Sequence, residues 1–90
     1  MLYRIITENK TESVDVIHEA LALHRIDGYT LIEARGYWKG TAENSIILEI
    51  DVDMCIATFH KICNIAKMIK LNLDQESVLV QRIENESLFI

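Results

Sequence analysis

The sequence has no proline, only three glycines and only two cysteines among its 90 residues. Because proline breaks helices and central strands by removing a backbone donor, its absence leaves every predicted element uninterrupted. Cys55 and Cys63 are eight residues apart on one predicted helix. That spacing corresponds to about 12 Å along the helix axis, which is too far for a disulfide. We therefore expect two reduced, buried thiols in a cytoplasmic protein.

Long apolar runs and clusters of positive charge are also missing. No apolar segment approaches the length of a membrane span, and the opening MLYRIITENK lacks the apolar core of a signal peptide. With 9 Lys and Arg against 14 Asp and Glu, the formal net charge is −5. This balance argues against binding to a nucleic-acid polymer or to an anionic membrane, because both attract clustered positive charge.

The familiar motifs of catalysis and metal binding are absent from the sequence. It contains no G-x-S-x-G, no P-loop and no G-x-G-x-x-G. His60 and Cys63 are spaced to share a helix face, but a zinc site needs three or four converging ligands. We interpret them as a surface histidine beside a packed cysteine. The sequence thus shows no signature of an enzyme, and we expect no cofactor and no metal.

Apolar residues, in contrast, are abundant and make up half of the chain. A domain this small buries only a modest fraction of its surface, so some apolar surface is left over. Association with further copies would cover that surface. We therefore expect a homo-oligomer.

The hydrophobic pattern predicts six elements in the order strand, helix, strand, strand, helix, strand. The predicted strands are residues 2–7, 29–38, 46–52 and 77–83, and the predicted helices are residues 11–25 and 54–70. Residues 87–90 (SLFI) are either a short extra strand or a tail that packs on a neighbour. This order predicts one α+β domain over residues 1–90, a ferredoxin-like βαββαβ sandwich with a four-stranded antiparallel sheet and two helices on one face.

The helix starts carry their own signals. Asn9 and Glu12 predict a capping box before the first helix, and Asp53 is the predicted N-cap of the second. The predicted buried stripe of the second helix consists of Cys55, Phe59, Ile62, Cys63, Ala66 and Ile69.

Alternation along the middle strands predicts two different sheet faces. Residues with a predicted core position are Ile46, Leu48 and Ile50 in one strand, and Ile32 and Ala34 in the other. The opposite positions mix charges with aliphatic side chains: Leu31, Glu33, Arg35, Ile47, Glu49 and Asp51. We interpret that mixed face as a part-polar subunit interface, with a solvated face as the alternative.

The segment GYWKGTAENS (residues 36–45) is the best candidate for a ligand site. Its aromatic rings are suited to stacking on a base, its cations to pairing with a phosphate or carboxylate, and its polar side chains to reading a polar edge. The candidate residues are Arg35, Gly36, Tyr37, Trp38, Lys39, Gly40, Glu43 and Asn44. The alternative is an ordinary hairpin whose aromatic side chains pack across the strands.

The run GYTLIEARGYWKG, followed by the strand IILEIDV and a helix, resembles the second strand, loop and third strand of PII-type signalling proteins. The opening LYRIIT, the first helix and the segment IDGYT agree in order and length. The resemblance implies a trimer with sheets facing one another across its centre and nucleotide or anion sites in the clefts between subunits. It assigns residues 35–40 to such a cleft. The loop after the second predicted strand is much shorter than the long regulatory loop of nitrogen-regulatory PII proteins. The usual glycine-rich ATP loop is replaced by LNLDQES.

These observations together favour a non-catalytic homo-oligomer, with a trimer preferred. It would bind a small anionic ligand, such as a nucleotide or cyclic nucleotide, between subunits, and act as a sensor or sequestering protein. One alternative is a protein-interaction module that uses Tyr37, Trp38 and the tail 87–90. Another is a small cofactor-free ferredoxin-like enzyme with His18 or His60 as its base.

Overall fold

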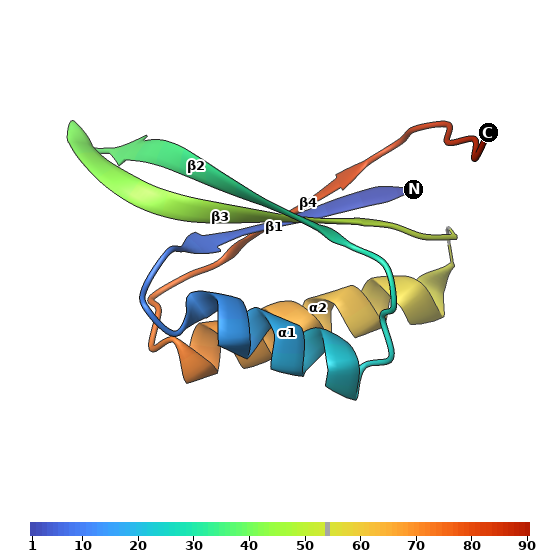
Figure 1. The fold of residues 1–90 in the computed structure, drawn as a ribbon, viewed down its shortest axis with the longest axis horizontal. Coiled ribbons are helices and arrows are strands. Elements are labelled where there is room, and N and C mark those ends of the chain that lie inside the picture. The colour runs from blue at the N-terminus through green and yellow to red at the C-terminus, as the bar shows by residue number, and fades with distance from the viewer. Residues whose placement is uncertain (54) are drawn as a thin grey trace.

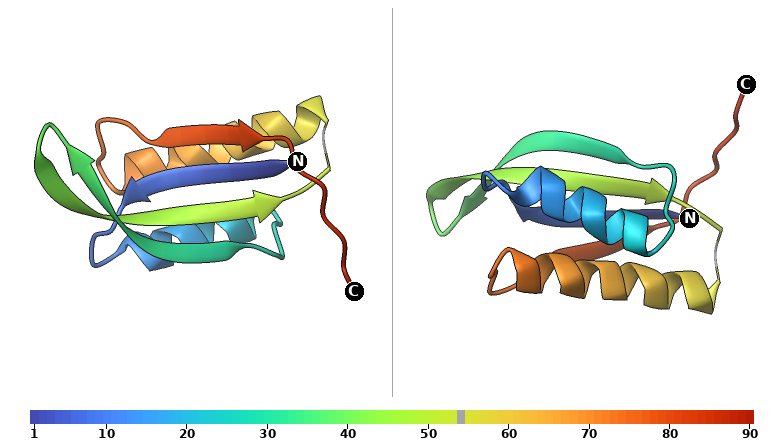
Figure 2. Two further views of the ribbon diagram at one scale, coloured as in Figure 1. Left: turned by 90° about the horizontal axis from the view of Figure 1, so that it is seen from above. Right: turned by 60° about the horizontal axis from the view of Figure 1, so that its bottom comes forward.

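The computed structural model describes residues 1–53 and 55–90, and its elements follow the predicted order (Figure 1). The strands are β1 (Leu2–Glu8), β2 (Thr30–Trp38), β3 (Thr41–Asp51) and β4 (Leu79–Ile83), and the helices are α1 (Ser13–Leu23) and α2 (Ile56–Asn72). The four strands form one antiparallel sheet in the order β2-β3-β1-β4. Both helices lie on one face of it, α2 below β4 and β1 and α1 below β3 and β2 (Figure 2). The predicted α+β ferredoxin-like sandwich is confirmed.

The core lies between the sheet and the helices. The central strands β1 and β3 send every second side chain into it, and each helix contributes its apolar stripe. The fully buried large side chains include Tyr3 and Ile5 of β1, Ile46, Leu48 and Ile50 of β3, Ile17 and Leu21 of α1, and Ile62, Ile65 and Ile69 of α2. The predicted core positions of β3 are therefore correct.

Both predicted helix caps are wrong. α1 begins after Glu12, whose side chain makes no capping hydrogen bond. The turn is instead held by the buried Ser13, whose Oγ accepts a hydrogen bond from the Lys10 N–H (2.7 Å) and donates one to the Glu8 carbonyl (2.9 Å). The N-cap of α2 is Cys55 rather than Asp53, and its Sγ accepts a hydrogen bond from the Thr58 N–H at 3.3 Å. The predicted helix start at Met54 lies outside the described residues.

The predicted burial of the two cysteines is also wrong. Cys55 is exposed at the start of α2, and Cys63 is half-buried. Phe59, another member of the predicted stripe, is partly exposed, whereas Ile65 is fully buried. The stripe is thus rotated toward Ile65, because α2 faces the sheet along Ile62, Ile65, Ala66 and Ile69.

The two faces of β2 are exchanged relative to the prediction. Leu31 pairs with the buried Leu48, so Leu31 and Glu33 lie on the helix side. Ile32 and Ala34 lie on the opposite face, which no helix covers. Alternation alone sets the spacing of two faces but not which of them is covered, and a shift of one residue in register exchanges them.

The uncovered face of the sheet carries one apolar and one polar row. Ile32, Ile47, Ile6 and Leu79 are successive cross-strand partners and form an aliphatic row over all four strands. Thr30, Glu49, Arg4 and Gln81 form the neighbouring row in the same way. Within it, the Arg4 Nε atom lies 2.7 Å from Glu49 Oε2. The predicted mixture of charge and aliphatic side chains therefore exists on this face, although β2 contributes different residues to it.

The chain beyond β4 forms no further strand, so that alternative for residues 87–90 is wrong. The tail leaves the sheet beside the N-terminus and extends away from it (Figure 1). Among the helices of residues 1–53 and 55–90, none combines the length and the apolar composition needed to cross a membrane.

Candidate functional site

The candidate site lies on a hairpin that extends past the helices. We call residues 35–44, the outer half of the β2–β3 hairpin, the arm (Figure 1). Its turn consists of Lys39 and Gly40, with φ angles of 50° and 80°. Two successive residues with positive φ form the turn that matches the twist of a two-stranded ribbon, and glycine adopts it without strain. The backbone geometry of the turn thereby explains why residue 40 is a glycine.

The register separates the predicted site residues onto two faces of the arm. Arg35 is paired with Asn44 and Tyr37 with Ala42, so their side chains lie on the helix side. Gly36 is paired with Glu43 and Trp38 with Thr41, so these lie on the uncovered face. Tyr37 and Trp38 are 71% and 66% exposed, so neither ring is buried within the chain. Within one copy, these residues therefore do not converge on a single cleft.

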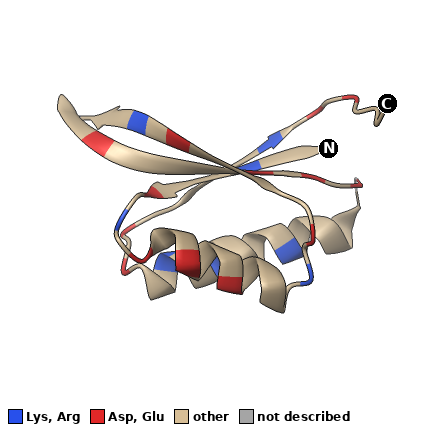
Figure 3. Cartoon of the chain, viewed as in Figure 1, with Lys and Arg blue, Asp and Glu red and all other residues tan. Residues whose placement is uncertain are grey.

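On the uncovered face of the arm, Gly36 has no side chain, so the surface between Trp38 and Glu43 is open at that position. A Cβ atom at Gly36 would lie only 3.3 Å from Ser45 Oγ, so a larger residue would fill this space. The Lys39 Nζ atom lies 5.8 Å from the centroid of the Trp38 ring, a cation–π arrangement. Charges of both signs occur on the arm (Figure 3). Within the described part of the chain, neither Lys39 nor Glu43 is in an ion pair, so both remain available to a ligand.

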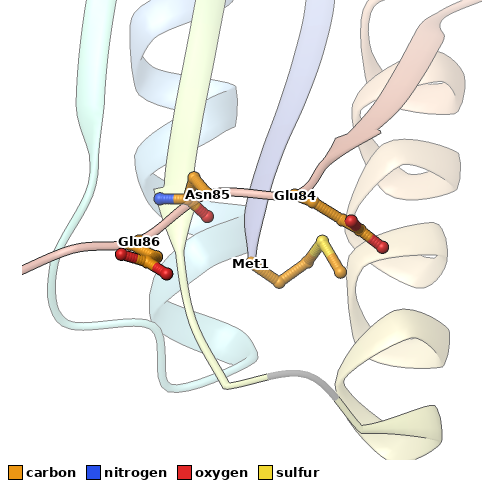
Figure 4. A pocket seen from close by; sticks show the side chains of 4 residues that line it. All are labelled: Met1, Glu84, Asn85 and Glu86. Carbon is orange, nitrogen blue, oxygen red and sulfur yellow. The ribbon is translucent and has the colours of Figure 1, made fainter.

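A second candidate is an acidic pocket at the opposite end of the sheet. It has a volume of about 590 Å³ and is lined by Met1, Glu84, Asn85 and Glu86 (Figure 4). Beside it, Asp51 Oδ2 accepts hydrogen bonds from the Ser87 hydroxyl and, at 3.0 Å, from Asn85 Nδ2. These two bonds hold the pKa of Asp51 below its ordinary value. Sequence reasoning missed the pocket, although the acidic run ENE after the last predicted strand was a signal for it.

The histidines named for the enzyme alternative differ in their surroundings. His18 of α1 is hydrogen-bonded through Nδ1 to the hydroxyl of Tyr29, next to the start of β2. His60 is exposed and lies edge-on to Phe59, with 6.2 Å between ring centroids. The Tyr29 hydroxyl gives His18 a side-chain partner that could relay a proton. Among residues 1–53 and 55–90, no group of three or more His, Cys, Asp or Glu side chains is placed to hold a metal ion.

Comparisons with known proteins found similar solved structures but no related sequence. No family model matches the sequence, and no curated protein matches it. The structure is similar to that of a phage SAM lyase in its apo state, with 23% identity, a TM-score of 0.69, and coverage of 88% of this chain and 75% of that one. It is also similar to a phage SAM lyase in complex with S-methyl-5'-thioadenosine, with 22% identity, a TM-score of 0.67, and coverage of 88% and 76%. At this identity the similarity shows the shared fold.

These comparisons contradict the expectation of a non-catalytic sensor or sequestering protein that binds a nucleotide or cyclic nucleotide. Both similar structures are of an enzyme, which favours the alternative of a small ferredoxin-like enzyme. The resemblance to PII-type proteins and the binding role of residues 35–40, Glu43 and Asn44 stay predictions.

Proposed function

We propose that this protein is a small ferredoxin-like lyase that cleaves S-adenosylmethionine (SAM) or a closely related sulfonium nucleoside. The observation that carries the proposal is the similarity, over 88% of the chain, to SAM lyase structures with and without S-methyl-5'-thioadenosine. That compound is what remains of SAM once its aminobutyrate chain has left the sulfur.

The chemistry makes modest demands on a protein. The bond between the sulfonium sulfur and Cγ breaks, and its electron pair stays on sulfur as a neutral thioether. The carbon fragment balances in one of two ways. Its own carboxylate attacks Cγ and gives a lactone, or a Cβ proton passes to water or to the substrate's own carboxylate and the Cβ–H electron pair forms an alkene. Because the leaving group is already activated, the main contributions of the protein are orientation and electrostatics.

The uncovered face of the arm suits such a substrate. An indole ring attracts cations, and Trp38 already has the Lys39 ammonium 5.8 Å from its centroid. In this assignment the ring stacks on the adenine or faces the sulfonium, and Lys39 pairs with the substrate carboxylate. Glu43, on the same face, balances the positive charge of the sulfonium or ammonium group.

The arm by itself offers a surface without an opposite wall, so the proposed site is completed by a second copy. The uncovered face of the arm continues into the aliphatic row Ile32–Ile47–Ile6–Leu79. A neighbour that packs on this row would stand beside Trp38 and Glu43. The adjacent Arg4–Glu49 pair presents both charges and is therefore complementary to a second copy of itself.

The Ile47→Glu variant places a charge in the aliphatic row. It is expected to lower both the mass measured by native mass spectrometry and the activity.

The proposal is tested by incubating the purified protein with SAM and measuring S-methyl-5'-thioadenosine by liquid chromatography with mass spectrometry. The co-product, lactone or alkene, identifies the route.

Trp38→Ala is expected to lower kcat/KM by about 2- to 30-fold, the range of a cation–π contact. Glu43→Gln is expected to lower it by about ten-fold or more, as for a lost hydrogen bond to a charged group.

The matched control is Leu23→Ala, which removes an exposed apolar side chain at the C-terminal end of α1, outside the arm. It is expected to leave the rate unchanged. A protein that releases no thioether from SAM contradicts the proposed function. Activity that survives both arm substitutions contradicts only the assigned site.

A further inference from the structure

The C-terminal tail is the most exposed apolar segment of the molecule. Leu88, Phe89 and Ile90 are 83%, 103% and 115% exposed, so they contact essentially nothing in their own chain. Three consecutive bare aliphatic and aromatic residues are costly in water, which indicates that another surface covers them.

The base of the tail is held in a defined direction. Asn85 Nδ2 donates to Asp51 Oδ2 at 3.0 Å and to Ser87 Oγ at 2.9 Å, and the Ser87 hydroxyl also bonds Asp51. Since Asp51 ends β3, these bonds draw the tail across the end of β1 toward the β3 and β2 side of the sheet (Figure 2, left). The tail therefore leads away from the β4 edge.

The β4 edge carries an apolar groove that no segment of the described residues fills. It lies between α2 and β4, has a volume of about 220 Å³, and is lined by Cys63, Ala66, Val78 and Val80 with Lys67 and Lys70. Pockets for small ligands usually measure about 300–1,000 Å³, so this groove is of a size for side chains. Within residues 1–53 and 55–90, neither lysine is in an ion pair.

We propose that the tail of one copy docks in the α2–β4 groove of a second copy. The apolar residues 88–90 match the apolar lining, and the tail acids Glu84 and Glu86 match Lys67 and Lys70 in charge. Among the strands of residues 1–53 and 55–90, β4 pairs with β1 alone, so its outer edge can accept an added strand.

The occupant is a second copy rather than the same chain. Val78 lies just before β4 and Val80 near its start, whereas the tail leaves from its end. To reach its own groove, the tail would have to reverse direction and give up the bonds of Asn85 and Ser87 to Asp51. With Asn85 and Ser87 held on Asp51, residues 88–90 extend at most about 10 Å further, so the second copy must lie directly beside this end of the sheet.

The native Cys63 in the groove allows a direct test. In a Cys55→Ser background, the variants Leu88→Cys, Phe89→Cys and Ile90→Cys are made one at a time, so that two apolar anchors always remain. Each is oxidised mildly and analysed by non-reducing electrophoresis and intact mass spectrometry. Because a disulfide forms only when the Cα atoms approach within about 7 Å, at least one variant is expected to give a reducible Cys63-linked dimer or ladder.

The matched control adds Cys63→Ala to each variant and is expected to abolish the cross-link. A bridge within a monomer would overturn the proposal, because it would show the tail in its own groove. Dimers that form equally without Cys63, or no cross-link at any of the three positions, would also overturn it. The readout does not depend on SAM cleavage, so it stands or falls separately from the proposed activity.

Charge exchange provides a second test without cysteines. Lys67→Glu with Lys70→Glu is expected to lower the native mass, and adding Glu84→Lys with Glu86→Lys is expected to restore it. Failure of the second pair to restore the mass would contradict a direct tail–groove contact.

Discussion

The two halves of the β2–β3 hairpin make a useful comparison. In the inner half, Ile46, Leu48 and Ile50 are fully buried against the helices. In the arm, the same two strands continue with the same pairing, but Tyr37 and Trp38 stand largely exposed. Strand pairing alone therefore does not decide burial, because the helices α1 and α2 end before the hairpin does (Figure 1).

The difference separates stability from function. The inner half contributes the apolar burial that drives folding. The arm contributes little to folding but presents an indole, a lysine and a carboxylate to its surroundings. Functional elements are commonly drawn from such regions of low local stability.

The largest loss of stability is expected from a substitution in the buried inner half of the hairpin. Leu48→Ala, at a fully buried position, is expected to lower the free energy of unfolding by about 2–5 kcal/mol in a urea titration. Tyr37→Ala, in the arm, is expected to change it by no more than about 0.5 kcal/mol. An equal loss in both variants would mean that the arm packs against another chain.

A smaller loss is expected at the turn that joins β1 to α1. Ser13 is buried and its hydroxyl makes two backbone hydrogen bonds, so Ser13→Ala is expected to cost about 1–2 kcal/mol. Ser77→Ala, at an exposed position before β4, is the control and should stay within about 0.5 kcal/mol. Thermal unfolding of the three proteins compares them, and equal stability would show that the hydroxyl has no structural role.

A substitution at the turn of the arm is expected to change the stability of the arm alone. Gly40→Ala places a side chain at φ = 80° and should cost about 1 kcal/mol, seen as faster hydrogen exchange of the arm amides. Gly28→Ala is the matched control, because Gly28 has no positive φ and open space around its Cα. If both variants exchange alike, the turn is not the constraint that shapes the arm.

The smallest effect on stability, but a clear one on reactivity, is expected at Cys55. Hydrogen bonds from the Thr58 side chain and N–H lower the pKa of this thiol. A lower pKa means more thiolate near neutral pH, so alkylation of Cys55 in a Cys63→Ala background should reach half its maximal rate below the pH usual for cysteine. Thr58→Val is expected to move that midpoint up, and an unchanged midpoint would contradict the assigned cause.

Particular residues show how far sequence reasoning reaches. The alternation of Ile46, Leu48 and Ile50 correctly predicted the core face of β3, and the order of elements correctly predicted the ferredoxin-like sandwich. The same reasoning placed Ile32 on the wrong face and buried Cys55, which caps α2 instead. Both errors arose where a repeat fits two placements and only the neighbouring element selects one.

The candidate site was likewise predicted only in part from the sequence. The sequence named Trp38, Lys39 and Glu43 among its candidate binding residues, and strand alternation already separated Tyr37 from Trp38. Only the register shows that Tyr37 and Arg35 lie on the helix side of the arm. It also missed the acidic pocket, because Met1 and Glu84 come together only when β4 returns beside β1.

By itself the sequence determined the kind and order of the elements and the alternating core positions of β3. These depend on local backbone preferences and on periodicity within a short window. Only the tertiary structure decided which face of β2 is covered, how far the hairpin extends beyond the helices, and where the tail points. Those features depend on contacts between segments far apart in the chain, and no short window of sequence contains both partners of such a contact.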